Sequence, residues 1–211
     1  MAPEHDDAIG ASKHALRAEL RQRRREHAAA LADDDATAER TQAVADRLAW
    51  WAMVRGAGVA AAYASYGDEP STSALLEALR ASSLRVLLPI MGAGGALEWS
   101  PYNGIEDLQP NDRGVPEPHG PRYAPRALEG VDLIIVPALA VDADGYRLGQ
   151  GAGYYDRALP RLRPDVPIIA LLHDGEVLPA GAIPHDAHDV PVTHVCTPTG
   201  GLTAVGTHRE Q

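Results

Sequence analysis

Apolar segments alternate along the chain with segments whose composition or spacing predicts helices. Six segments are apolar or β-branched and are predicted to be buried strands: 58–63, 84–88, 96–99, 131–136, 167–172 and 192–197. Three segments are predicted to be helices: 12–27, 36–51 and 73–81. Strands that alternate with helices are typical of a parallel sheet covered on both faces. The pattern therefore predicts an α/β protein, a three-layer α/β/α sandwich around a mainly parallel open sheet.

The length of 211 residues suits a single domain, 1–211, with a substantial core of its own. Residues 1–10 are polar and acidic, and residues 200–211 carry only a short apolar piece, so both ends are expected to be loose tails. Residues 102–123 are rich in Pro, Gly, Asn and Asp and show no periodicity. A loop of that length inside a domain is usually functional or mobile.

Composition narrows the class of protein. Hydrophobic residues make up 45% of the chain and charged residues 23%, which is ordinary for a globular protein. Cys196 is the single cysteine, so neither a disulfide framework nor a zinc–cysteine site is expected. No leader and no membrane-length apolar run is recognised, so we expect a cytoplasmic protein without membrane contacts, and a monomer. The net charge of −10 disfavours nucleic acid as a partner and requires a locally basic pocket for any anionic substrate.

A glycine-rich segment after the strand at 131–136 is the most distinctive stretch of the chain. It reads Arg147-Leu-Gly-Gln-Gly-Ala-Gly-Tyr-Tyr-Asp-Arg157. Glycine at every second position lets backbone N–H groups approach a ligand closely, and N–H groups that lead into a helix form a nest suited to phosphate. The segment is not a Walker A loop, because no Lys-Ser or Lys-Thr pair follows the glycines. It is not a dinucleotide-binding fingerprint either, because Tyr154 occupies the place of the third glycine. A flexible connection is the alternative, but the flanking arginines, the paired tyrosines and Asp156 favour anion binding.

Basic residues gather on one face of the predicted first helix. Lys13, Arg17 and Arg21 recur at intervals of four residues. Lys13 is the only lysine of the chain, and its compact ammonium group suits phosphate as a point charge. The alternative is that a single lysine simply reflects an arginine-rich composition. Most of the basic cluster 21–25 is expected to be a solvated helix face.

Two carboxylates follow predicted strands at the place where open α/β sheets bind ligands. Glu69 comes after the strand 58–63, and Asp142 comes after the strand 131–136. The alternative for Glu69 is a carboxylate that favours the dipole of the next helix, whose expected N-cap is Thr72 or the serine before it.

The glycine-rich segment, with the preceding Val136-Pro-Ala-Leu-Ala-Val-Asp142, closely resembles the signature of the 5-formyltetrahydrofolate cyclo-ligase family, also called 5,10-methenyltetrahydrofolate synthetases. The pattern Lys13-x-x-Leu-Arg17-x-x-Leu-x-x-x-Arg24 and the element Glu69-x-x-Thr72 resemble the same family, so the likeness covers the first helix and about residues 60–197. It implies an open Rossmann-like sheet, which can carry an antiparallel edge. Three positions depart from the family pattern: Val141 replaces a usual Phe, His185 a common Glu, and Ala152 a common Gly. The last would matter if the backbone there needs a positive φ.

The resemblance also implies a reaction and a site. The reaction is the ATP- and Mg²⁺-dependent cyclisation of 5-formyltetrahydrofolate to 5,10-methenyltetrahydrofolate, with release of ADP and phosphate. Lys13 and Arg147 are expected to be catalytic, and the expected ATP site is Lys13, Arg17, Arg147, Leu148, Gly149, Gln150, Gly151, Ala152, Gly153, Tyr154 and Tyr155. The expected folate site is Glu69, Glu117, Asp142 and Tyr154, and the expected Mg²⁺ ligands are Asp156 and Asp189. Core packing is an equally ordinary role for Tyr155.

Other functions remain as alternatives. One alternative is a non-catalytic nucleotide- or folate-binding relative with the same fold. Loss of Glu69, Lys13 or Asp156 would have favoured this alternative, but all three residues are present. A sugar-phosphate isomerase or acyl-CoA transferase would use Glu69 or Asp142 as acid, base or nucleophile, without ATP. Nucleic-acid binding through the arginine-rich helix is opposed by the overall charge. His185 and His188 suggest a metal site, but zinc lacks a third ligand with matching spacing.

Overall fold

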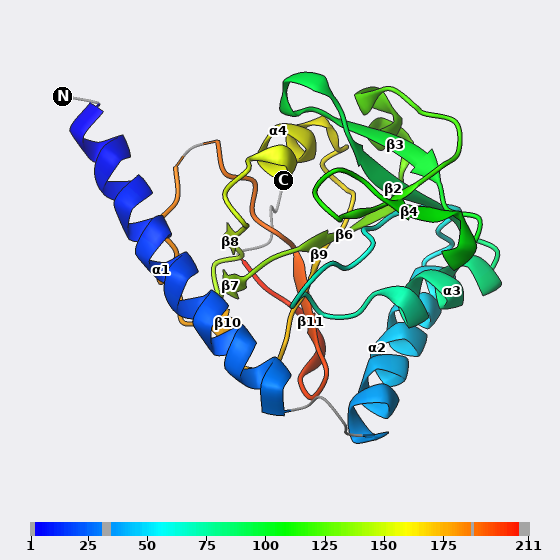
Figure 1. Ribbon diagram of the computed structural model, residues 1–211, viewed down its shortest axis with the longest axis horizontal. Coiled ribbons are helices and arrows are strands. Elements are labelled where there is room, and N and C mark those ends of the chain that lie inside the picture. The colour runs from blue at the N-terminus through cyan, green and yellow to red at the C-terminus, as the bar shows by residue number, and fades with distance from the viewer. Residues whose placement is uncertain (1–2, 31–34, 187, 207–211) are drawn as a thin grey trace.

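The structure is a computed structural model that describes residues 3–30, 35–186 and 188–206. The strands of its central sheet are β1 (Val59–Ala61), β2 (Arg85–Met91), β3 (Leu97–Pro101), β6 (Leu133–Pro137), β9 (Ile168–Leu171), β11 (His194–Thr197) and β12 (Gly201–Ala204). Within the described residues they form one seven-stranded sheet in the order β12-β11-β9-β6-β1-β2-β3 (Figure 1). The five inner strands run parallel, and both edge strands pair antiparallel. The predicted α/β class with a mainly parallel sheet is confirmed.

Helices and loops cover the two faces of this sheet. The helices are α1 (Pro3–Ala30), α2 (Asp35–Val54), α3 (Ser73–Ala81) and α4 (Tyr154–Ala158), with 3₁₀ helices at 93–95, 105–107, 125–130 and 159–161. Successive residues of β6 point to opposite faces: Ile135 packs with Leu48 and Leu76 of α2 and α3, whereas Ile134 packs with Leu159 and Trp99 on the other side. Two separate apolar cores therefore hold the sheet between its outer layers.

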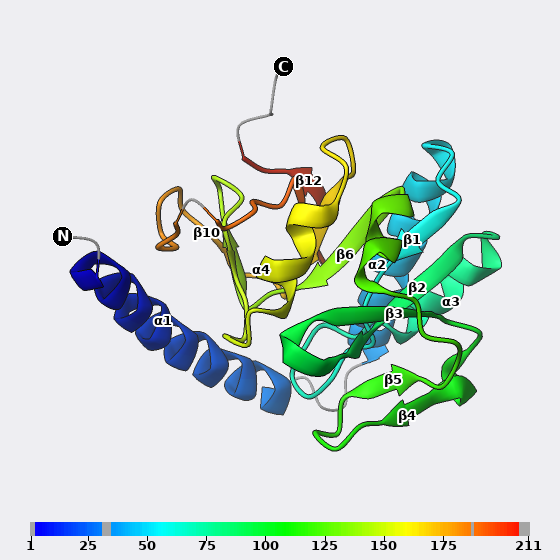
Figure 2. The ribbon, with the colours of Figure 1, turned by 90° about the horizontal axis from the view of Figure 1, so that it is seen from above.

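Helix α1 lies along one side of the molecule, away from α2 and α3 (Figures 1 and 2). A small three-stranded sheet of β7 (Ala140–Asp142), β8 (Arg147–Leu148) and β10 (Val177–Leu178) lies next to it. Leu20 of α1 is buried in a third apolar cluster with Leu139 and Leu148. In the described part of the chain, no helix is both long and apolar enough to cross a membrane.

The structure corrects three expectations about local order. Residues 3–10 belong to α1, consistent with acidic residues favouring the first turns of a helix, and residues 201–204 form the edge strand β12 by backbone pairing with β11. Residues 1–2 and 207–211 of the expected tails lie outside the described residues. The stretch 102–123 contains the hairpin of β4 (Leu108–Pro110) and β5 (Pro116–Pro118), whose prolines are tolerated in edge strands but hide the alternation expected of a strand.

Candidate functional site

A cavity of about 430 Å³ lies at the carboxyl ends of β1 and β6, between α1, the glycine-rich loop and the β4–β5 hairpin. Most of the predicted site residues line it: Lys13, Arg17, Glu69, Glu117, Arg147, Gly149, Gln150, Gly151, Ala152, Gly153, Tyr154, Tyr155, Asp156 and Asp189. Residues that are far apart in the sequence therefore meet at the edge of the sheet where ligands bind in open α/β folds.

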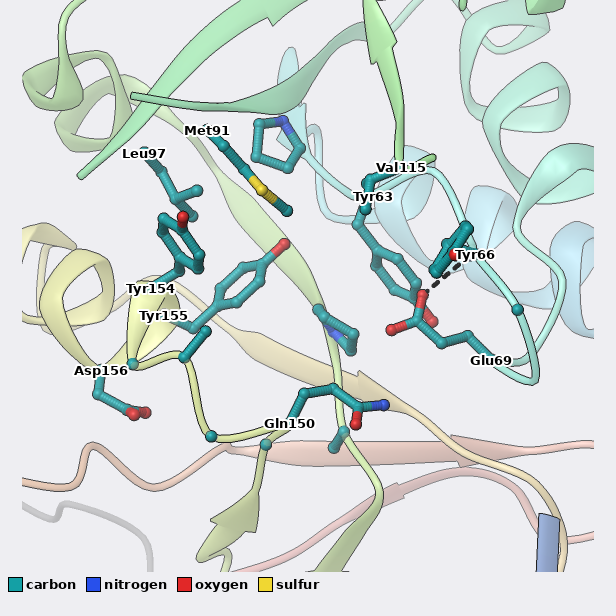
Figure 3. A pocket seen from close by; sticks show the side chains of 18 of the residues that line it. Tyr63, Tyr66, Glu69, Met91, Leu97, Val115, Gln150, Tyr154, Tyr155 and Asp156 are labelled. Carbon is teal, nitrogen blue, oxygen red and sulfur yellow. Dashed lines mark hydrogen bonds between the residues drawn. The ribbon is translucent and has the colours of Figure 1, made fainter. Parts of the chain in front are cut away.

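The wall of the cavity formed by β2, β3 and the hairpin is largely apolar. Met91 and Leu97 line it from the strands, and Val115 lines it from the hairpin. Figure 3 shows Tyr155 reaching into the space between these residues and Gln150 of the glycine-rich loop. The cavity thus combines an apolar wall with a charged rim, an arrangement suited to a flat ring joined to an anionic group.

Only some residues of the glycine-rich loop have backbone angles that favour glycine. Gly151 and Gly153 have positive φ angles of 102° and 71°, and a Cβ on Gly153 would lie 2.6 Å from Nη1 of Arg157. Ala152 between them does not have a positive φ; among the described residues, Ser83 is the only non-glycine that does. The departure at Ala152 therefore requires no left-handed backbone.

The basic face of α1 docks on this loop. Arg17 donates from Nε to the carbonyl oxygen of Gly149 over 2.9 Å, and Arg21 donates to the carbonyl and side-chain oxygens of Gln150 over 2.9–3.0 Å. Burial lowers the pKa of Arg17 and the nearby charge of Arg21 lowers it further, whereas Asp156 and Asp189 act in the opposite direction. Guanidinium groups thus cover the loop that the sequence predicts to bind phosphate.

Arg24 is the buried member of the basic cluster 21–25, most of which was expected to be solvated. Its side chain is buried, donates to both carboxylate oxygens of Glu176 over 2.6 and 2.8 Å, and donates to the carbonyl oxygen of Ala138 over 2.5 Å. Ala138 lines the cavity directly beyond β6. Arg24 follows the buried Leu20 by four residues, so the two share the face of α1 that packs on the protein. That spacing is the sequence feature from which the burial of Arg24 could have been predicted.

The two carboxylates expected to hold Mg²⁺ are paired with cations of the site. Asp189 accepts a hydrogen bond from Nζ of Lys13 over 2.7 Å, and Asp156 pairs with Arg147. Burial alone would raise the pKa of Asp189, but the ammonium of Lys13 and a backbone N–H bring it below its ordinary value. The charges of both carboxylates act to raise the pKa of Arg17, and all three residues line the cavity.

These carboxylates fit magnesium better than a softer metal. Within the described residues, no group of three or more His, Cys, Asp or Glu side chains is placed to hold a metal ion. Magnesium characteristically binds few protein carboxylates and shares phosphate oxygens, whereas zinc prefers several nitrogen or sulfur ligands. His185 stacks on Tyr146, with ring centroids 3.3 Å apart and planes 9° from parallel. The stacked ring of His185 therefore gives no support to a zinc site.

Glu69 lies in a desolvated part of the cavity. Its Oε2 atom accepts a hydrogen bond from the backbone N–H of Tyr66 over 3.1 Å, and burial raises the pKa of its carboxyl group. Thr72 does not cap α3 with its side chain; instead Thr72 and Ser65 exchange side-chain-to-backbone hydrogen bonds of 2.8 and 3.1 Å. This exchange closes the loop that presents Glu69.

Two buried tyrosine hydroxyls line the cavity without a hydrogen-bond partner among the described residues. They belong to Tyr155, predicted from the sequence, and Tyr63, which sequence reasoning missed. Tyr63 reads in the sequence as the last residue of a buried strand, so no motif singled it out. Figure 3 shows the two rings on different walls, with Glu69 next to Tyr63.

Three predicted residues have structural contacts of their own. Glu117 lines the cavity but also accepts hydrogen bonds from the Met91 backbone N–H and the Asn111 amide over 2.9 and 2.8 Å. Asp142 is fully buried and accepts from the backbone N–H groups of Tyr146 and Ile183, and Leu148 is buried in the α1 cluster. Asp142 of β7 and Leu148 of β8 are not among the described residues that line the cavity.

Comparisons with known proteins identify the family of the chain. The model of the 5-formyltetrahydrofolate cyclo-ligase family matches residues 9–198. The chain is 37% identical over 200 residues to a 5-formyltetrahydrofolate cyclo-ligase of Mycolicibacterium smegmatis, covering 92% of this chain and 97% of the relative. It is 30% identical over 164 residues to the protein of the same name in Escherichia coli K12, covering 76% and 89%.

Solved structures share the fold. A 5,10-methenyltetrahydrofolate synthetase of Aquifex aeolicus superposes with a TM-score of 0.69 at 24% identity, covering 94% of this chain and 95% of that one. A 5,10-methenyltetrahydrofolate synthetase from Mycoplasma pneumoniae gives a TM-score of 0.64 at 20% identity, covering 87% and 96%. The family match across most of the sequence and the identity to nearly full-length relatives show that the chain belongs to the 5-formyltetrahydrofolate cyclo-ligase family, whose members are ligases.

Proposed function

We propose that the protein catalyses the ATP- and Mg²⁺-dependent cyclisation of 5-formyltetrahydrofolate to 5,10-methenyltetrahydrofolate. The observation that carries the proposal is the meeting of Lys13, Arg17 and Arg147 at the glycine-rich loop of a cavity that also contains Glu69. Membership of the cyclo-ligase family supports the same reaction. In this proposal the enzyme is a cytoplasmic monomer that acts on a small molecule, and its net charge of −10 supports a partner other than nucleic acid.

The chemistry requires activation of an amide-like formyl group. Direct attack by N10 on the formyl carbon stalls because the oxygen is a poor leaving group. Transfer of the γ-phosphoryl group of ATP to the formyl oxygen forms an O–P bond, releases ADP and makes the carbon electrophilic. N10 then forms the new C–N bond and gives up its proton, and the C–O bond breaks with departure of phosphate. Such a sequence needs positioning and charge neutralisation rather than a covalent nucleophile on the protein.

Each charged group has a place in this scheme. Lys13, Arg17 and Arg147 bind the phosphates, and the backbone of 149–153 forms the phosphate cradle. Asp156 and Asp189 would hold Mg²⁺, which supplies positive charge at the phosphate oxygens when bound. The cation-rich loop and the desolvated Glu69 belong to the same cavity, which supports one site for both ATP and folate.

The folate ring binds on the apolar side of the cavity. Glu69 accepts hydrogen bonds from the ring, and Tyr154 or Tyr155 stacks on it. The carboxylate of Glu69 is ready to bind N–H donors because it has already been withdrawn from much of its solvent.

The test is to mix the purified protein with 5-formyltetrahydrofolate and to follow the near-ultraviolet absorbance of the methenyl product with and without MgATP. A rise only with MgATP is the expected result. Binding of both ligands by calorimetry without any rise would instead identify a non-catalytic relative. A protein that neither binds nor converts the folate would reject the proposal.

A further inference from the structure

Tyr63 is a buried polar group that the fold itself does not explain. Its side chain is 3% exposed, and its hydroxyl has no hydrogen-bond partner among the described residues. A buried hydroxyl without a partner costs free energy, so its retention calls for a reason. Tyr63 also lines the cavity, which suggests that the missing partner is supplied by a ligand.

The surroundings of Tyr63 define the chemistry of that ligand. Burial raises the pKa of Tyr63 well above its ordinary value, and the charge of Glu69 raises it further, so the phenol is neutral and can donate a hydrogen bond. The neighbouring carboxylate of Glu69, when ionised, accepts hydrogen bonds and cannot donate them. A ligand that satisfies both groups must present an acceptor beside one or two N–H donors, on a body flat and apolar enough for a wall of Met91 and Leu97.

The ring of a reduced folate has this pattern along one edge. Its 2-amino group and N3–H are adjacent donors, and its 4-oxo oxygen is an acceptor next to N3. We infer that Tyr63 is a substrate-binding residue whose hydroxyl donates to the 4-oxo oxygen while Glu69 accepts from N3–H and the 2-amino group. The inference rests on the proposed function and deepens it, since it names the edge of the ring that the protein reads.

The experiment compares two tyrosine-to-phenylalanine variants. Tyr63→Phe removes only the unpartnered hydroxyl, so its melting temperature without ligand should not fall. Its Kd for 5-formyltetrahydrofolate, measured by calorimetry, should rise about tenfold, while the Kd for a non-hydrolysable Mg–ATP analogue should stay unchanged. The matched control is Tyr102→Phe, because Tyr102 is also buried but its hydroxyl already donates to Glu77 over 2.6 Å outside the cavity. That variant should lose stability and keep its folate affinity.

Three results would count against the inference. A folate Kd for Tyr63→Phe within twofold of the wild-type value would overturn it. A lower melting temperature together with weaker binding of both ligands would also overturn it, because that result indicates a structural role. Failure of the wild-type protein to bind 5-formyltetrahydrofolate would reject the proposed function itself and this inference with it. A wild-type protein that binds and converts the folate, with Tyr63→Phe behaving identically, rejects the role of Tyr63 alone.

Discussion

The ammonium nitrogen of Lys13 lies 2.7 Å from a carboxylate oxygen of Asp189, and both side chains are largely buried, with exposed fractions of 15% and 18%. A cation assigned to phosphate is thus paired with a carboxylate assigned to magnesium, and Arg147 with Asp156 repeats the arrangement. The opposite charges neutralise one another across the rim of the cavity. Under the proposed function, Lys13 and Arg147 would bind phosphate oxygens of ATP, and Asp189 and Asp156 would be the residues that hold Mg²⁺, so each ion pair would be exchanged for contacts with MgATP.

Lys13→Ala tests the first half of that exchange. Loss of the ammonium should raise the KM for ATP by about tenfold or more and change the KM for 5-formyltetrahydrofolate much less, because the point charge contacts phosphate. Steady-state kinetics with each substrate varied in turn measures the split. Arg23→Ala on the same helix is the control, since the Arg23 side chain is 62% exposed and pairs with Glu19. Equal effects on both KM values would refute the assignment.

Asp156→Asn tests the second half. Its side chain is 49% exposed, so the amide should be accommodated without loss of the fold, as circular dichroism can verify. Turnover should be abolished and the apparent affinity for Mg²⁺ in the presence of nucleotide should fall, because the amide carries no charge for the metal. Asp165→Asn, at a side chain 76% exposed, should leave both unchanged. Near-normal turnover of Asp156→Asn at an ordinary magnesium concentration would reject the metal role.

Arg24→Met tests the anchor of α1. The substitution keeps much of the side-chain length but leaves the carboxylate of Glu176 buried without its partner, which should lower the free energy of unfolding by about 3–5 kcal/mol. Urea denaturation measures the change. Adding Glu176→Met to the same chain removes the stranded charge and should recover part of the loss. A single variant as stable as the wild type would show that the pair does not hold the helix.

Glu69→Gln makes a prediction about pH. Burial raises the folded-state pKa of Glu69, so its ionised form destabilises the folded protein. This cost is absent below the unfolded pKa of about 4.3, grows as the pH rises from there to the higher folded-state pKa, and is fully present above it. The variant should therefore melt higher than the wild type at about pH 7 and equally at about pH 4, while losing folate affinity. Thermal melts across this range decide it, and a stabilisation that does not vary with pH would contradict burial as the cause.

Gly153→Ala and Ala152→Gly form a pair that separates backbone strain from side-chain contacts. Gly153 has a positive φ and little space for a Cβ, so alanine should cost about 1–2 kcal/mol and reduce ATP affinity. Ala152 lacks a positive φ, so glycine there should cost less than about 1 kcal/mol and keep activity. Denaturation and ATP titration of both variants test this, and the reverse order of effects would overturn the interpretation of the loop.

Local patterns in the sequence predicted most strands of the central sheet and the helices α1, α2 and α3, but they could not predict which distant residues pair. The apolar run that became β6 and the helix at 73–81 follow from composition and spacing. The ion pair of Arg24 does not: its place after Leu20 indicates the docking side of the helix, but its partner Glu176 lies 152 residues away and cannot be identified from local spacing. Asp142 shows a second limit: its position after a strand predicted a ligand-binding role, whereas the small sheet whose backbone its carboxylate contacts was not predicted.

The docking of α1 bears on how the protein is made. Lys13, Arg17 and Arg24 leave the ribosome before their partners, which follow 176, 132 and 152 residues later. The basic face of the helix therefore lacks these partners until the glycine-rich loop, Glu176 and Asp189 have also emerged. Contacts between such distant residues are slow to form because long stretches of chain must first be ordered. A nascent chain stalled before Asp189 would contain the glycine-rich loop and most of the parallel sheet, but the ammonium of Lys13 would lack its carboxylate.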